Sequence, residues 1–206
     1  MRRLKQQPVV SATLVILNAG IFLVCMFGRI SLTYIGGLDY TILEKKDYWR
    51  IITAMFLHSS IDHLFSNMII LFFVGAIIEK EIGHIKFAIL YLMSGVCGNL
   101  LSLLEKVTTE SRAYSIGASG AVFGLDGALL AMVLFWDRKL LQVTPARVAA
   151  MILLSVYSGF TGDNIDNAAH VGGLAAGFLL GCIICLLEQI KKKYRQSKHI
   201  NDEVTN

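Results

Sequence analysis

Apolar residues fall in long blocks along this chain rather than in amphipathic stripes. Short segments rich in Gly, Asn, Asp, Lys and Arg separate the blocks. Apolar runs of this length with few charges are typical of helices that cross a lipid bilayer. The pattern therefore predicts an all-α membrane protein with six transmembrane helices. The predicted spans are about 9–28, 63–78, 87–104, 117–135, 146–157 and 168–187.

The composition supports a chain that lies in a membrane. Hydrophobic residues make up 55% of the sequence and charged residues only 17%, whereas soluble domains carry about 25% charged residues. The net charge of +4 is modest. We expect a lipid bilayer around the chain and no nucleic-acid partner. Because no internal repeat is visible, we treat residues 1–206 as one membrane domain.

The placement of the basic residues predicts the orientation in the membrane. Six spans put both termini on the same side, and that side would collect 13 of the 19 lysines and arginines. Short cytoplasmic loops carry an excess of Lys and Arg. Both termini are therefore predicted to be cytoplasmic. Residues 188–206 would form a basic cytoplasmic tail whose end we expect to be disordered.

Four polar residues occur near the starts of the second, fourth and sixth spans. They are His63, Asn67, Ser119 and His170, and this topology puts all of them at the outer face of the membrane. Polar side chains inside a bilayer are costly and by default indicate a functional site. Each residue taken alone has a simpler explanation, since Asn and His also link helices by hydrogen bonds. Their shared depth on three helices favours a site.

Glycines could bring the fourth and sixth spans into close contact. Gly173 and Gly177 share a helix face with His170, and a stripe of small residues lets two helices approach closely. The fourth span offers a matching surface after Ser119. Packing these two surfaces together would place Ser119 next to His170. The small residues of that surface are Gly120, Gly124 and Gly127.

A serine beside a histidine is the minimum that nucleophilic catalysis requires. The histidine can accept the hydroxyl proton as a general base and return it to the leaving group. His63, Asn67 and the backbone N–H of Ser119 could donate hydrogen bonds to the oxyanion. Gly117 has no side chain to fill the space around Ser119, and we assign it to the same oxyanion site. A zinc protease motif is not present, because His58 and His63 are five apart with no glutamate between them.

Three motifs together resemble the rhomboid family of intramembrane serine proteases. They are Gly117-Ala118-Ser119-Gly120, His63-Leu64-Phe65-Ser66-Asn67 and the stretch from Ala169 to Gly177. The similarity covers nearly all of the chain. It implies a six-helix bundle of the bacterial type, a Ser119–His170 dyad without a third carboxylate, and no metal or cofactor. Family substrates are single-span membrane proteins that are cut in or near the membrane.

The resemblance also implies supporting roles for residues outside the dyad. Trp49 and Arg50 match a Trp-Arg pair in the first external loop of the family, and Glu79 matches a glutamate at the end of the second span. Phe123 matches an aromatic residue that packs near the dyad histidine. His58 falls where bacterial members often carry a histidine.

Several questions stay open at the level of sequence. Asp126 lies about two helical turns below Ser119, where the family usually has a small or apolar residue, and we interpret it as structural. Cys182 and Cys185 are interpreted as ordinary buried thiols. The alternative to a protease is a catalytically silent member of the same fold that binds membrane proteins. We expect a multi-pass protein of the bacterial plasma membrane, while its natural substrate and oligomeric state are not predicted.

Overall fold

A computed structural model of the chain describes residues 7–135, 146, 149–150, 153, 157 and 165–204. Helices account for most of this described part, and its β-structure consists of a single antiparallel bridge between Leu38 and Ser115. The predicted all-α fold class is confirmed. The helices are α1 (Val9–Gly28), α2 (Leu32–Gly36), α3 (Ile42–Lys45), α4 (Arg50–Thr53), the 3-10 helix η1 (Ala54–Phe56), α5 (Ile61–Ile82), α6 (His84–Thr109), α7 (Ser119–Phe135) and α9 (Asn167–Val204).

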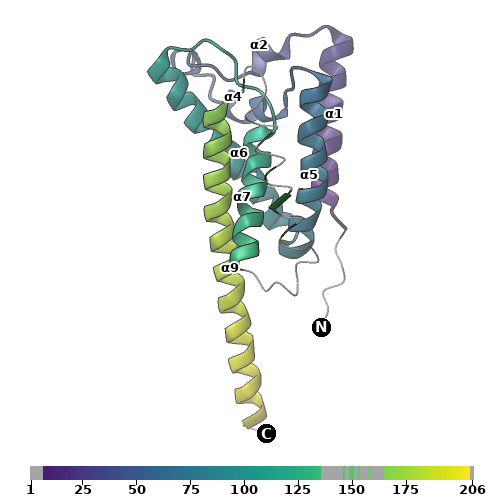
Figure 1. Cartoon of the computed structure of the whole chain (residues 1–206), viewed down its shortest axis with the longest axis vertical. Helices are drawn as coiled ribbons and strands as arrows, with labels where there is room; N and C mark the ends of the chain where they lie inside the picture. Colours follow the sequence, from purple (N-terminus) through teal and green to yellow (C-terminus); the bar gives the residue numbers. More distant parts are fainter. Residues whose placement is uncertain are drawn as a thin grey trace.

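Four of the described helices are long and apolar enough to cross a membrane: α1, α5, α6 and α9. Helix α7 is also apolar but has only 17 residues, so it is about 25 Å long and shorter than a hydrocarbon core of about 30 Å. Figure 1 shows α7 in the middle of the bundle. The predicted fifth span, 146–157, falls largely outside the described residues, so the count of six stays a prediction.

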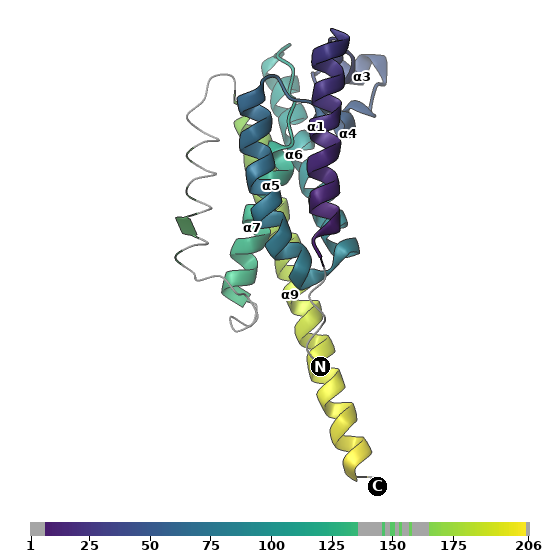
Figure 2. The same cartoon turned by 90° about the vertical axis from the view of Figure 1, so that its right-hand side faces the viewer.

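The long helices alternate in direction until α7 and α9, which run the same way. Helix α1 begins and α9 ends toward the same end of the molecule (Figures 1 and 2). Helices α5 and α9 begin at the opposite end. We call that end the upper end, as it is drawn in Figure 1. That the lower end faces the cytoplasm stays a prediction.

Three helices continue beyond the predicted spans: α5 runs to Ile82, and α6 and α9 extend further still. Helix α6 extends to Thr109, into a stretch that we expected to be loop, and α9 continues from the span through the basic tail to Val204. The expected disorder at the end of the tail is therefore wrong as far as Val204. After Gly181 the tail contains neither Gly nor Pro, and its Lys, Arg, Gln and Glu residues favour helix. Glu188 pairs with Lys86 of α6, and Gln189 Nε2 donates to Phe135 O at 2.8 Å.

Helix α7 forms the centre of the core. It packs most extensively against α9, while α6 packs against both of them. Twelve of its 17 residues are buried, which explains why its sides are apolar apart from the buried Asp126. The segment from α2 to η1 packs on the upper part of α6 through a small second cluster. That cluster contains Leu38, Ile42, Ala54 and Leu103.

Glu79 joins three helices near the lower end of the bundle. Its carboxylate accepts hydrogen bonds from the backbone N–H groups of Val10 and Ser11, each at 2.8 Å, and from the Ser11 hydroxyl at 2.8 Å. His84 Nδ1 lies 2.5 Å from Glu79 Oε1. A carboxylate at a helix N-terminus satisfies N–H groups that lack intrahelical partners. Glu79 thus fixes the start of α1 against α5 and α6, at the other end of α5 from His63.

Candidate active site at the start of α7

The site is built around Ser119, the first residue of α7, and His170, in the first turn of α9. His170 Nε2 lies 2.9 Å from Ser119 Oγ, and only 5% of the His170 surface is exposed. The Phe123 ring stacks on the imidazole, with ring centres 4.2 Å apart and an interplanar angle of 6°. This stacking restrains the imidazole so that Nε2 faces the hydroxyl. The sequence-predicted Ser119 and His170 are therefore adjacent.

Close contact between α7 and α9 brings these two residues together. A Cβ atom built on Gly173 would lie 1.9 Å from Gly120 O, and one on Gly177 would lie 1.9 Å from Gly124 O. At Gly127 the corresponding distance to Leu174 O is 2.2 Å. No side chain fits at such distances, so the two backbones are in direct contact. The predicted pairing of glycine surfaces is present, and it places His170 beside the serine.

His63 and Gly117 lie on the other side of the serine. Gly117 has φ +129°, a conformation that residues with a side chain rarely adopt. A Cβ atom there would lie 2.7 Å from His63 Nε2 and 3.7 Å from Ser119 Oγ. The missing side chain thus leaves a small space between the imidazole and the hydroxyl. Asn67 is buried one turn further along α5, and its Nδ2 donates to His63 O at 3.1 Å.

His58 and Ser59, which lie just before α5, both contact the side chain of His63. His58 Nε2 accepts a hydrogen bond from Ala118 N at 3.5 Å, and its ring packs edge-on against His63 with ring centres 5.0 Å apart. Burial, together with the nearby His63, lowers the pKa of His58 to about 3, so the ring is neutral at pH 7. Ser59 Oγ lies 3.1 Å from His63 Nδ1. The sequence indicated His58 only by resemblance and did not indicate Ser59.

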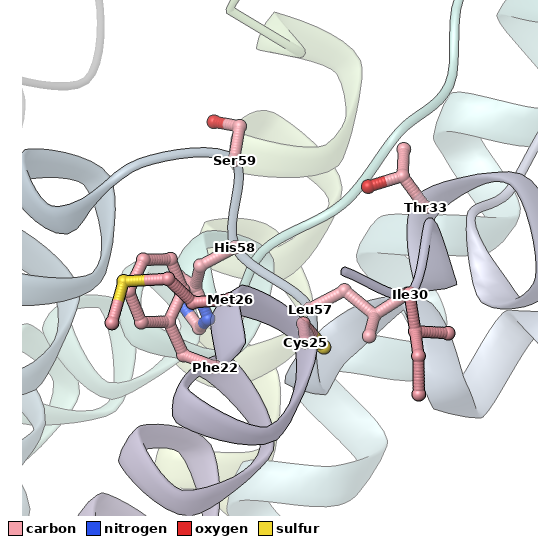
Figure 3. A pocket seen from close by; sticks show the side chains of 8 residues that line it. All are labelled: Phe22, Cys25, Met26, Ile30, Thr33, Leu57, His58 and Ser59. Carbon is pink, nitrogen blue, oxygen red and sulfur yellow. The ribbon is translucent and has the colours of Figure 1, made fainter. Parts of the chain in front are cut away.

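A cavity of about 230 Å³ lies between the end of α1 and the segment before α5. Figure 3 shows that its lining includes the side chains of Phe22, Met26, His58 and Ser59. Neither Ser119 nor His170 lines it. The cavity is therefore next to His58 and Ser59 and is separate from the serine–histidine pair.

The backbone before Ser119 is held by the first loop. Leu38 and Ser115 exchange two backbone hydrogen bonds of 3.0 and 2.7 Å, and Gly117 N donates to Ala54 O at 2.9 Å. Arg50 supports the loop itself, because its Nη1 donates to Gly37 O at 3.3 Å. Figure 1 shows α2 and α4 at the upper end of the molecule, and α4 contacts α6.

Arg50 also contacts two neighbours within the loop. Its Nη2 lies 3.2 Å from Asp47 Oδ2, and its guanidinium lies 5.5 Å from the centre of the Trp49 ring. The predicted supporting residues Trp49 and Arg50 thus belong to the loop that pairs with the backbone before the nucleophile.

Asp166 precedes α9, and its carboxylate has several partners near the site. Its Oδ2 accepts hydrogen bonds from the Ser102 and Ser115 hydroxyls, and its Oδ1 accepts from Ala169 N at 2.9 Å. Lys106 Nζ lies 3.7 Å from Oδ2. Burial alone would raise the pKa of Asp166, but these hydrogen bonds and the Lys106 charge outweigh it and hold the pKa below its ordinary value.

The sequence interpretation missed the Asp166 cluster, although one signal was present. An Asp immediately before a helix commonly caps the N-terminus, and here it stands four residues before a candidate catalytic histidine. Its serine and lysine partners come from other parts of the chain. Asp126 is fully buried in α7, and its structural role stays a prediction.

These features define a helical membrane protein in which a half-buried serine and a buried histidine lie side by side where two packed helices begin. The model of the family described as "Rhomboid domain" matches residues 45–187. The chain is 34% identical over 183 residues to RHOMBOID-like protein 5 of Arabidopsis thaliana, which covers 82% of this chain and 58% of that protein. The chain belongs to the rhomboid family.

Two bacterial relatives carry names that state an activity. Rhomboid protease GluP of Bacillus subtilis is 33% identical over 156 residues, covering 76% of this chain and 30% of that protein. Putative rhomboid protease YdcA of the same organism is 34% identical over 155 residues, covering 75% of this chain and 73% of that protein. The chain thus matches a little over half of the Arabidopsis relative and less than a third of GluP, so activity, substrates and partners are proposals for this chain.

Proposed function

We propose that this protein is an intramembrane serine endopeptidase that hydrolyses a peptide bond in single-span membrane proteins. The observation that carries the proposal is the 2.9 Å approach of His170 Nε2 to Ser119 Oγ inside an apolar bundle. Nucleophile and base must lie within about 2.6–3.2 Å for direct proton transfer. The names of the two bacterial relatives, which include the word protease, support the same activity.

In the first half of the reaction Ser119 attacks the substrate. The hydroxyl proton passes to His170 Nε2 while Ser119 Oγ bonds to the carbonyl carbon of the scissile peptide. The tetrahedral intermediate collapses when its C–N bond breaks and His170 gives the proton to the leaving amine. An ester between Ser119 and the N-terminal part of the substrate remains.

In the second half water hydrolyses this ester. His170 accepts a proton from the water, whose oxygen bonds to the acyl carbon, and then returns the proton to Ser119 Oγ. The products are a new carboxylate and a new amine. No cofactor is required for this cycle.

The oxyanion of each tetrahedral intermediate needs hydrogen-bond donors. We assign this role to the backbone N–H of Ser119, to His63 Nε2 and to Asn67 Nδ2, with the space at Gly117 receiving the oxygen. Loss of one donor typically lowers the rate by about 10²–10³-fold. A neutral His63 donates from Nε2 only in the tautomer whose Nδ1 carries no proton, and a hydrogen bond donated by the Ser59 hydroxyl to Nδ1 favours that tautomer.

We further propose that the site opens toward the outer face of a plasma membrane. Ser119 starts a helix too short to cross the bilayer alone, and it lies on the side opposite the basic tail. Under the positive-inside rule the basic tail is cytoplasmic. A substrate would then be cut near the outer end of its span.

A comparison of the protein with its Ser119→Ala variant tests the activity. Both would be reconstituted in lipid vesicles with a generic single-span membrane protein, and the products would be followed on a gel. The proposal predicts two fragments with the unaltered protein and none with Ser119→Ala. Equal behaviour of the two proteins would instead favour a non-catalytic family member that binds membrane proteins.

A further inference from the structure

The Asp166 carboxylate connects three separate parts of the fold. Ser102 belongs to α6, Ser115 lies in the segment that leads to α7, and Ala169 is in the first turn of α9. Ser102 and Ser115 are both buried. A charged acceptor forms stronger hydrogen bonds than a neutral one, and three donors converge on this one group.

Lys106 supplies a buried counter-charge to the same carboxylate. It lies one turn after Ser102 on α6, is only 6% exposed, and reaches Asp166 Oδ2 at 3.7 Å. Removing one partner of a buried ion pair strongly destabilises the charge that stays behind. Lys106 therefore needs a negative charge beside its ammonium group. A neutral hydrogen-bond acceptor at position 166 would not provide that charge.

The positions of these residues relate the cluster to the catalytic pair. Asp166 is four residues before His170, and its backbone oxygen accepts the His170 N–H at 3.2 Å. Ser115 is four residues before Ser119. The Asp166 carboxylate thus links two chain segments: the one that starts α9 just before His170, and the one around Ser115 that leads to Ser119.

We propose that Asp166, paired with Lys106, is a positioning residue that sets the distance between Ser119 and His170 without touching the substrate. This inference rests on the proposed protease function. The glycine contacts hold α7 against α9 along their length, while Asp166 holds the segment before α7 against the start of α9. Without this link the two chain segments can separate where the reaction takes place.

The expected effect follows from the sensitivity of proton transfer to distance. A displacement of about 1 Å between catalytic groups can lower a rate by about 10²-fold. Asp166→Asn keeps an oxygen that can accept from Ala169 N, but it removes the charge that faces Lys106. We therefore expect a loss of about 10²-fold for Asp166→Asn.

The test measures how fast Ser119 reacts with a small fluorophosphonate. This probe phosphonylates the oxygen of activated serines, with fluoride as the leaving group, and needs no substrate docking. The full-length protein in lipid vesicles is compared with Asp166→Asn, Lys106→Met and the double variant, while Ser119→Ala gives the background. A thermal unfolding curve of each preparation gives its fraction of folded protein, and each labelling rate is expressed per folded protein. Glu79→Gln serves as the matched control, because it alters a buried carboxylate that also joins three parts of the fold. Glu79 lies near the lower end of α5, far from the site at the upper end.

The inference predicts a specific order of labelling rates. Asp166→Asn should label about 10²-fold more slowly than the unaltered protein. The double variant should label at least tenfold faster than Asp166→Asn, because it no longer contains a buried lysine without a counter-charge. Glu79→Gln should lower Tm but leave the labelling rate of the folded protein unchanged.

Three results would count against these proposals in distinguishable ways. Labelling of Asp166→Asn within twofold of the unaltered protein would overturn the positioning role. A double variant no faster than Asp166→Asn would overturn the part assigned to Lys106. If the unaltered protein labels no more than Ser119→Ala, the proposed protease function fails, and the positioning role fails with it.

Discussion

Replacing Gly173 with alanine should separate the catalytic pair by forcing α9 away from α7. The added Cβ would lie 1.9 Å from Gly120 O, whereas such contacts are not found below 3.0 Å. Relief of the clash requires a movement of about 1 Å, and the atom that blocks it is a backbone oxygen that cannot rotate away. Gly173 is three residues from His170, so the imidazole moves with it.

A shift of this size predicts a large loss of activity with a smaller loss of stability. A displacement of about 1 Å corresponds to a decrease of about 10²-fold in kcat. Overpacking of this kind typically costs about 1–3 kcal/mol of stability. The assay is cleavage of a single-span substrate in vesicles, with kcat and KM determined separately and Tm measured on the same preparations.

Two control substitutions show whether contact at the helix interface is the cause. Gly20→Ala in α1 adds a Cβ that meets nothing within 4 Å, so it should leave kcat unchanged. Gly95→Ala meets the end of the Met55 side chain at 2.0 Å, which can move aside, so its effect should be small. Activity of folded Gly173→Ala within threefold of the unaltered protein would refute the claim that this close approach sets the dyad.

Three further substitutions test single contacts. Ser59→Ala removes the partner of His63 Nδ1 and should lower kcat about tenfold with little change in KM; an unchanged kcat would exclude a role in fixing the tautomer. The pKa of His58 is lower in the folded protein, at about 3, than its unfolded value of 6.5. The neutral His58 ring therefore contributes fully to stability above pH 6.5, and this contribution is lost as the pH falls from 6.5 toward 3. The loss is about 1.4 kcal/mol of unfolding free energy per pH unit. Unfolding curves of His58→Gln should lack this part of the acid destabilisation. Asp126→Asn should keep most of the cleavage activity, and complete loss with an intact fold would show that the carboxylate is needed.

The fold class and the catalytic pair could be predicted because both leave local patterns in the sequence. Blocks of apolar residues indicated the helices. The spacing of Gly173 and Gly177 after His170 matched the small residues after Ser119, and this match was enough to place the two residues together. Phe123 was expected near His170 from the family resemblance, and its ring stacks on the imidazole.

The surroundings of the pair could not be predicted in the same way. The hydrogen bonds of Asp166 to Ser102 and Ser115 join residues 64 and 51 positions apart, and no periodic pattern relates them. The pairing of Leu38 with Ser115 depends on how an irregular loop folds over α6. The helix at the end of the tail was not predicted, because chain termini are often disordered, although the residues of the tail favour helix.

The most direct test of the proposed reaction is mass spectrometry of substrate fragments produced in water enriched in oxygen-18. Hydrolysis through a Ser119 ester predicts one internal cut near the outer end of the substrate span. One heavy oxygen should enter the new carboxylate, and both fragments should disappear with Ser119→Ala and with His170→Ala. Fragments that persist unchanged in either variant, or a new carboxylate that contains no heavy oxygen, would contradict hydrolysis by this serine–histidine pair.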